Sequence, residues 1–159
     1  MIGWRIITRA AALPLALLSL QVAAAGLEIK DGYVREMPPG QTVSAAFMTL
    51  HNSTEAPIVL VAASSDAADQ AEIHGHRHSA EGMRMEKMER LEVPAGGDQA
   101  LQPGGYHLML IGLKRPLNEG DKVGITLRDE TGKAYSATLP VARMMGAGAP
   151  MPGGPMHTH

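Results

Sequence analysis

Short segments of alternating apolar and polar residues, separated by turn sequences, run along the chain between residues 27 and 141. In the first of them, Leu27, Ile29 and Tyr33 alternate with polar residues or glycine, which is the period of a strand with one buried face. Turns rich in Gly, Pro, Asn and Asp recur about every 8 to 12 residues, a spacing typical of β-sandwiches and barrels. The sequence therefore predicts an all-β fold.

This pattern gives a set of expected strands. They cover residues 27–34, 43–52, 58–63, 71–78, 82–91, 93–101, 106–113, 122–128 and 134–141. The segments 71–78 and 82–91 are expected to be the two arms of a hairpin, and the polar stretch 64–70 is expected to form one helical turn.

The N-terminal stretch does not follow this pattern. Its first nine residues include Arg5 and Arg9 and no acid, and they precede a short apolar run that ends in alanines at 23–25. These are the features of a secretory signal peptide over residues 1–25, cleaved near Ala25. The alternative, an uncleaved membrane anchor, is disfavoured because the apolar run is too short to span a bilayer comfortably. We expect a periplasmic protein that is not stably inserted in the membrane after cleavage, with one domain over residues 26–143.

The C-terminal stretch 144–159 contains only Met, His, Gly, Pro and small residues, without apolar periodicity, and is predicted to be a flexible tail. Its candidate auxiliary metal ligands are Met144, Met145, Met151, Met156, His157 and His159. The two histidines are also suited to Cu(II). The alternative is a Gly/Pro tail with incidental methionines, or the remnant of a tag.

Charge and cysteine content exclude several classes of function. Without residues 1–25 the chain has 12 basic and 16 acidic residues, which argues against nucleic acid or an anionic membrane as partner. The sequence contains no Cys. A blue-copper or CuA electron-transfer site needs a Cys thiolate, so a typical electron-transfer cupredoxin is excluded.

Four residues stand out as candidate metal ligands: His74, Met85, His107 and Met109. Two imidazoles and two thioethers form a soft, neutral donor set that suits Cu(I). On the expected strand 106–113, His107 and Met109 are two apart and share one face, while Leu108 and Leu110 point into the core. The expected hairpin brings His74 and Met85 near each other.

Further candidate ligands lie close by. His76, His78 and Met83 are candidate auxiliary metal ligands. Three histidines on one strand face, His74, His76 and His78, also admit a zinc site and a zinc hydrolase. No residue nearby is marked as a general base, and no Ser-His-Asp spacing or phosphate-binding loop stands out, so we do not expect an enzyme.

The same residues carry a resemblance to a known family. Residues 71–74, 82–88 (GMRMEKM) and 93–113 (VPAGGDQALQPGGYHLMLIGL) resemble the periplasmic copper chaperones of the PCu(A)C family, and the resemblance extends over residues 27–141. The spacing His-x10-Met-x21-His-x-Met matches the copper motif of that family at His74, Met85, His107 and Met109.

This resemblance implies a cupredoxin-like Greek-key β-sandwich that binds Cu(I) through these four residues. It also implies delivery of copper to the CuA subunit of cytochrome c oxidase, or to an assembly thiol protein that acts with it. The alternative is a periplasmic copper-buffering or tolerance protein without a dedicated acceptor, which would use the same ligands.

Overall fold

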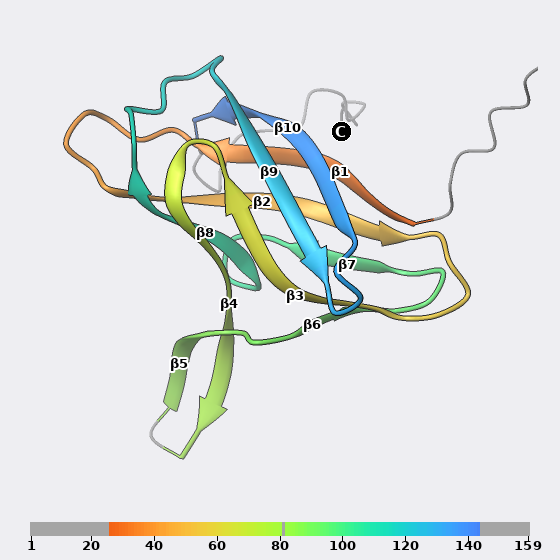
Figure 1. Ribbon diagram of the computed structural model, residues 1–159. Coiled ribbons are helices and arrows are strands. Elements are labelled where there is room, and N and C mark those ends of the chain that lie inside the picture. Colours follow the sequence, from red (N-terminus) through yellow and green to blue (C-terminus); the bar gives the residue numbers. More distant parts are fainter. Residues whose placement is uncertain (1–25, 81, 144–159) are drawn as a thin grey trace, which may run out of the picture.

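The computed structural model describes residues 26–80 and 82–143, and within them every regular element is a β-strand (Figure 1). The strands are β1 (Leu27–Arg35), β2 (Val43–Asn52), β3 (Ile58–Ser65), β4 (Ala68–Ser79), β5 (Gly82–Lys87), β6 (Leu91–Val93), β7 (Asp98–Leu101), β8 (His107–Leu113), β9 (Lys122–Asp129) and β10 (Ala134–Ala142). The all-β prediction is confirmed. The expected signal peptide and Met/His-rich tail lie outside the described residues, and no helix suited to crossing a membrane occurs in the described part.

The strands form one sheet that curls into a cupredoxin-like sandwich. Its order is β5-β4-β8-β2-β1-β10-β9-β3-β6, and an additional pairing of Ala63 with Ala71 joins β3 to β4. Sequence neighbours are often not sheet neighbours, as in a Greek key; β1 pairs in parallel with β10 and antiparallel with β2. The β4–β5 hairpin projects from the sandwich (Figure 1).

The core consists of aliphatic residues that alternate along the strands. Residues with no exposed surface include Val34, Leu50, Leu60, Leu108, Leu110, Val123 and Leu127. Phe47 is also buried, but it lies between the core residues Ala46 and Met48. Because neighbouring residues of a strand point to opposite faces, its side chain is on the outer face of β2. The largest apolar side chain of this region is therefore outside the core.

Three expected elements differ in the structure. The expected strand 82–91 ends as β5 at Lys87, and Leu91–Val93 form the separate strand β6. The expected strand 93–101 is regular mainly at its end, in β7, after a turn in which Gly96 has a φ of 61°. The predicted helical turn over 64–70 is wrong, because β3 and β4 extend into that segment and meet at a tight turn. The Asp66 carboxylate accepts a hydrogen bond from the Gly124 N–H at 2.9 Å, which fastens the turn to β9.

Strands β7 and β8 run along β2 like one interrupted strand. β7 pairs with residues 48–51 of β2 and β8 with residues 43–46. The residues between them form a loop, closed by a hydrogen bond from the Gln102 N–H to the Tyr106 carbonyl at 2.8 Å. This loop places His107 at the start of β8.

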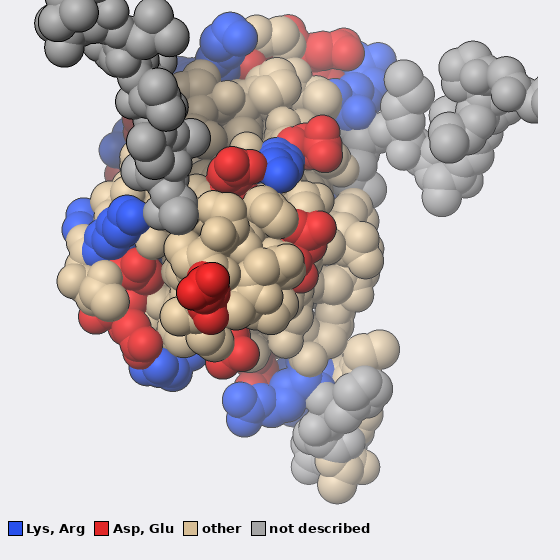
Figure 2. Space-filling view, turned by 90° about the vertical axis from the view of Figure 1, so that its right-hand side faces the viewer, with Lys and Arg blue, Asp and Glu red and all other residues tan. Residues whose placement is uncertain are grey.

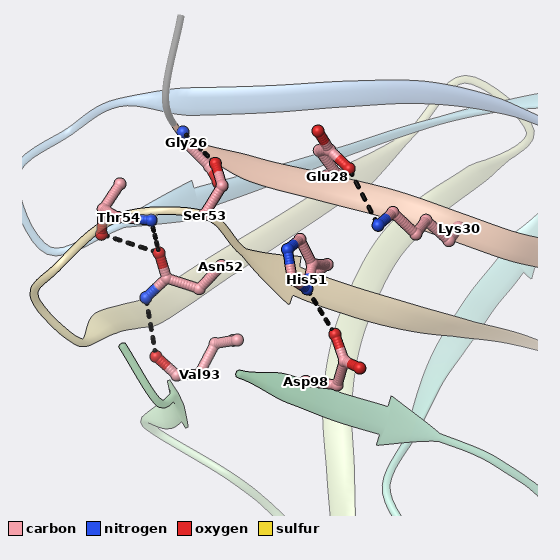
Figure 3. Close-up of polar contacts among 9 residues, drawn as sticks. All are labelled: Gly26, Glu28, Lys30, His51, Asn52, Ser53, Thr54, Val93 and Asp98. Atoms are coloured by element: carbon pink, nitrogen blue, oxygen red, sulfur yellow. Dashed lines mark hydrogen bonds and ion pairs between the residues drawn. The ribbon is translucent and has the colours of Figure 1, made fainter. Parts of the chain in front are cut away.

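Asn52 fastens the far end of β2 (Figure 3). Its side chain is fully buried and donates to the carbonyls of Ala56 and Val93, at 2.8 and 3.1 Å. Its Oδ1 accepts the N–H and the hydroxyl of Thr54. Because its amide groups are hydrogen-bonded, burial of the Asn52 side chain costs little free energy, and the bond to Val93 links β2 to β6.

Asp129 fastens the β9–β10 hairpin in a similar way. Its carboxylate, 6% exposed as a residue, accepts the hydroxyl and N–H of Thr131, the N–H of Lys133 and the hydroxyl of Tyr135. These bonds, that of the Thr131 hydroxyl first, lower the pKa of Asp129 below its ordinary 3.8, and burial together with the Asp129 carboxylate raises the pKa of Tyr135 to about 12.

We expect Asp129→Ala to lower the free energy of unfolding by about 2–3 kcal/mol, because several hydrogen bonds to a charged acceptor, itself buried, are lost together. Since folding lowers the pKa of Asp129, its stabilisation is complete above about pH 4 and is lost as the pH falls through the folded-state pKa. Urea unfolding between pH 7 and 3 measures both effects. Glu92→Ala, at an exposed acid on β6, is the control, and equal unfolding curves for the two variants would contradict the prediction.

Candidate metal centre

The strand pairing brings the two predicted histidine ligands together. His107 in β8 lies directly opposite His74 in β4, and their ring centres are 5.9 Å apart. Leu108 and Leu110 on the other face of β8 are fully buried, which confirms the expected orientation of this strand. His107 and Met109 therefore share the outer face with His74.

The two predicted methionine ligands lie diagonally from His74. Met109 is opposite Glu72 on β4, two residues before His74. Met85 is opposite His76, because the hairpin register pairs His74 with Lys87. Diagonal neighbours in an antiparallel sheet are about 7–8 Å apart, within reach of long side chains. The predicted hairpin is confirmed. Its register pairs Met85 with His76, so Met85 is a diagonal neighbour of His74 and not its direct partner.

Exposure increases along this face from β8 to β5. The His107 residue is 7% exposed, whereas Met85 and Met83 on the edge strand are 50% and 65% exposed. The candidate site thus has a buried floor on β8 and an open rim on the hairpin.

Aromatic rings enclose the floor. Phe47 lies with its ring centre 6.5 Å from that of His107, and Tyr33 packs behind Phe47 at 5.3 Å. On the core side, the Tyr106 ring lies against Gly75, where a Cβ atom would come within 2.6 Å of two ring carbons. Gly75 is therefore required for the close packing of the loop before His107 against β4.

A carboxylate orients His74. Glu72 places Oε2 3.0 Å from His74 Nε2 and Oε1 3.0 Å from Lys87 Nζ. The hydrogen bond with His74, followed by that with Lys87, lowers the pKa of Glu72, so the carboxylate is ionised at neutral pH. An ionised carboxylate only accepts, so neutral His74 carries its proton on Nε2 and keeps the Nδ1 lone pair free.

A backbone carbonyl orients His107 in the opposite sense. His107 Nδ1 lies 3.1 Å from the Gly105 carbonyl oxygen, which can only accept. Neutral His107 therefore carries its proton on Nδ1 and leaves the Nε2 lone pair free. Hydrogen bonds of both kinds are typical of metal-binding histidines, whose second nitrogen is held by a carboxylate or a carbonyl.

The other candidate ligands have different surroundings. His76 and Met83 lie on the same face as Met85, and the His76 Nδ1 atom is buried without a hydrogen-bond partner among the described residues. The backbone of His78 pairs with that of Met83, while the side chain of His78 and the tail ligands lie outside the described part. Met88 packs against the core and is not placed as a ligand.

The zinc alternative stays a prediction, because the side chain of His78, one of its three histidines, lies outside the described part of the chain. Among the side chains that the structure does describe, no three His, Asp or Glu residues gather closely enough to hold a metal ion. A separate polar row crosses β1, β2 and β7, where His51 Nδ1 lies 2.6 Å from Asp98 and Glu28 pairs with Lys30 (Figure 3). In Figure 2, acidic and basic side chains are interspersed over the face shown, and basic ones gather near the lower end.

Sequence reasoning missed Glu72, Phe47 and Gly75. For Phe47 a signal was present, because it is an odd number of residues from the core residues Ala46, Met48 and Leu50 and therefore points to the outer face of β2. Glu72 lies two residues before His74 on one strand face, and this spacing was a local signal for its role. The role of Gly75 depends on contact with Tyr106 in the loop at 102–106, for which the sequence has no local signal.

The two hydrogen bonds predict opposite tautomers in the neutral protein: the Nε2–H form for His74 and the Nδ1–H form for His107. Long-range ¹H–¹⁵N spectra of the metal-free protein above neutral pH distinguish the two forms. Glu72→Ala removes the preference of His74 and leaves that of His107 unchanged. The same tautomer at both residues would show that these bonds do not orient the rings.

Comparisons with known proteins agree with this architecture. The model of the family described as "Putative lipoprotein LpqE-like" matches residues 27–141. The chain is 35% identical over 126 residues to "Putative lipoprotein Lxx21020" of Leifsonia xyli subsp. xyli, a match that covers 78% of this chain and 74% of the relative.

Solved structures share the fold. CuI-DR1885 of Deinococcus radiodurans is 33% identical with a TM-score of 0.57, over 80% of this chain and 87% of that protein. The copper-bound PCuAC domain of PmoF2 is 20% identical with a TM-score of 0.60, over 74% and 92%. The family match and the identity to its relatives extend over most of the sequence, and the chain belongs to the LpqE-like family, the PCuAC-type family that its sequence resembles.

Proposed function

We propose that this protein is an exported copper chaperone that binds Cu(I) through His74, Met85, His107 and Met109. The observation that carries the proposal is the pair of facing imidazoles, His74 and His107, each held through one nitrogen so that the other is free to bind a metal. The copper-bound state of DR1885, at 33% identity, supports copper as the cargo.

The donor set explains the choice of metal. Thioether sulfur and imidazole nitrogen are soft or intermediate donors, and neither adds a charge, which favours Cu(I) over Zn, Mg or Ca. The ionised Glu72 next to His74 offsets part of the charge of Cu(I) without binding it. The set lacks thiolates, so a thiol-bearing acceptor can compete for the ion.

The open rim supports transfer by ligand exchange. Met85 is half exposed on an edge strand, whereas His107 is buried. A ligand of the acceptor can therefore enter from the hairpin side as Met85 leaves, while the histidines still hold the ion. The acceptor in this proposal is the CuA subunit of cytochrome c oxidase, or an assembly thiol protein acting with it, in the periplasm. The tail residues 144–159 add an auxiliary set that captures copper, with His157 and His159 suited to Cu(II).

Cu(I) titration against a competing chelator tests the ligand set. In a full chain with the six tail ligands replaced by serine, we expect one Cu(I) with mixed nitrogen and sulfur ligands by X-ray absorption. His107→Ala and Met109→Ala should each weaken binding by more than about tenfold, since loss of a ligand exceeds the effect of losing an outer-shell partner. Met88→Leu removes a nearby thioether that faces the core and should leave the affinity unchanged. Unaltered affinity in both alanine variants would exclude this site.

A deletion strain tests delivery. Without the protein, we expect oxidase activity to fall at low copper and to return with added copper or with the wild-type chain, but not with His107→Ala/Met109→Ala. Normal oxidase activity at low copper, combined with sensitivity at high copper, would instead support the copper-buffering function.

A further inference from the structure

The hairpin register groups a second set of soft donors one step outward from His74. His76 lies directly opposite Met85, and Met83 lies two residues before Met85 on the same face of β5. This part of β4 extends beyond His74, where pairing with β8 ends. Among the described residues its remaining strand partner is β5, so the group lies on the projecting hairpin (Figure 1).

One ring nitrogen of His76 lacks a partner in the described structure. Its Nδ1 atom is buried and has no hydrogen-bond partner among the described residues. A buried nitrogen without a partner keeps the full cost of its desolvation, so most such atoms in proteins are satisfied. A metal ion at Nδ1 would compensate that cost.

The methionines on the same face have no packing role that explains them. Met83 and Met85 are two of the three large apolar side chains exposed in the described part of the chain, and both are on the edge strand of the hairpin. Exposed thioethers contribute little to folding, but they are flexible and soft donors. By the register, Met85 is opposite His76 and Met83 is diagonal to it on the same face, so the three residues can form a ligand set.

We propose that His76, Met83 and Met85 form an outer Cu(I) position, and that Met85 is shared with the inner position at His74, His107 and Met109. This inference rests on the proposed copper function. Because Met85 serves both positions, the hairpin holds one ion at a time. The outer position is where copper enters or leaves.

The passage between the two positions is a ligand exchange without a redox step. The bond from copper to Met85 persists, while the bonds to His76 and Met83 break and those to His74, His107 and Met109 form. The ion remains Cu(I), and all the donors are neutral. Neighbouring residues on one strand face are about 7 Å apart, so the ion moves by one such step.

The first experiment removes the inner position. In the full chain with the tail ligands replaced by serine, His74→Ala/His107→Ala/Met109→Ala should still bind one Cu(I), at least tenfold more weakly, with one nitrogen and two sulfur ligands by X-ray absorption. Adding His76→Ala should abolish this binding. Arg77→Ala, on the opposite face of the same strand, is the matched control and should have no effect.

The second experiment keeps the inner position intact and does not depend on the folding of the triple variant. His76→Ala alone should leave the equilibrium affinity for Cu(I) within about twofold and slow the transfer of Cu(I) to a small-molecule chelator severalfold. An unchanged transfer rate, or loss of all binding in the folded triple variant, overturns the outer position while the inner site stands. If the wild-type chain itself binds no Cu(I), the proposed function fails, and this inference fails with it.

Discussion

The pairing of β4 with β8 is the constraint on which the candidate site depends. It places His74 opposite His107, and the same register places Ile73 opposite Leu108 in the core. A slip by one residue would turn His74 into the core and expose Ile73, so burial of the apolar face holds the imidazoles in position. The free energy that stabilises the sandwich therefore also fixes the geometry of its outer face.

The orientation of the two imidazole rings also depends on groups that hydrogen-bond to them. Glu72 acts on His74 from the same strand, whereas Gly105 acts on His107 from the loop between β7 and β8. That loop packs closely only because Gly75 leaves room for the Tyr106 ring. The two free nitrogen lone pairs thus depend on the backbone conformation of two separate segments, and the fold alone orients them.

The limits of the sequence prediction have physical causes. The alternation of apolar and polar residues was sufficient to predict the all-β fold and the hairpin. It also predicted the shared face of His107 and Met109, because Leu108 and Leu110 are buried on the opposite face. It could not give the register of the hairpin, since nearly every residue of β5 is exposed and no apolar stripe selects one pairing. It also missed the separate short strand β6 at Leu91–Val93, which depends on pairing with β3.

The exposure of the hairpin methionines has a consequence for chemical damage. Oxidants reach solvent-facing sulfur first, and a sulfoxide exchanges the soft thioether for a polar group. Met83 and Met85 stand in solvent, whereas Met48 is 3% exposed inside the core. Oxidative stress would therefore modify the hairpin thioethers and spare the packing of the sandwich. Under the proposed function, the protein would remain folded with weaker copper binding, and reduction of the two sulfoxides would restore it without new synthesis.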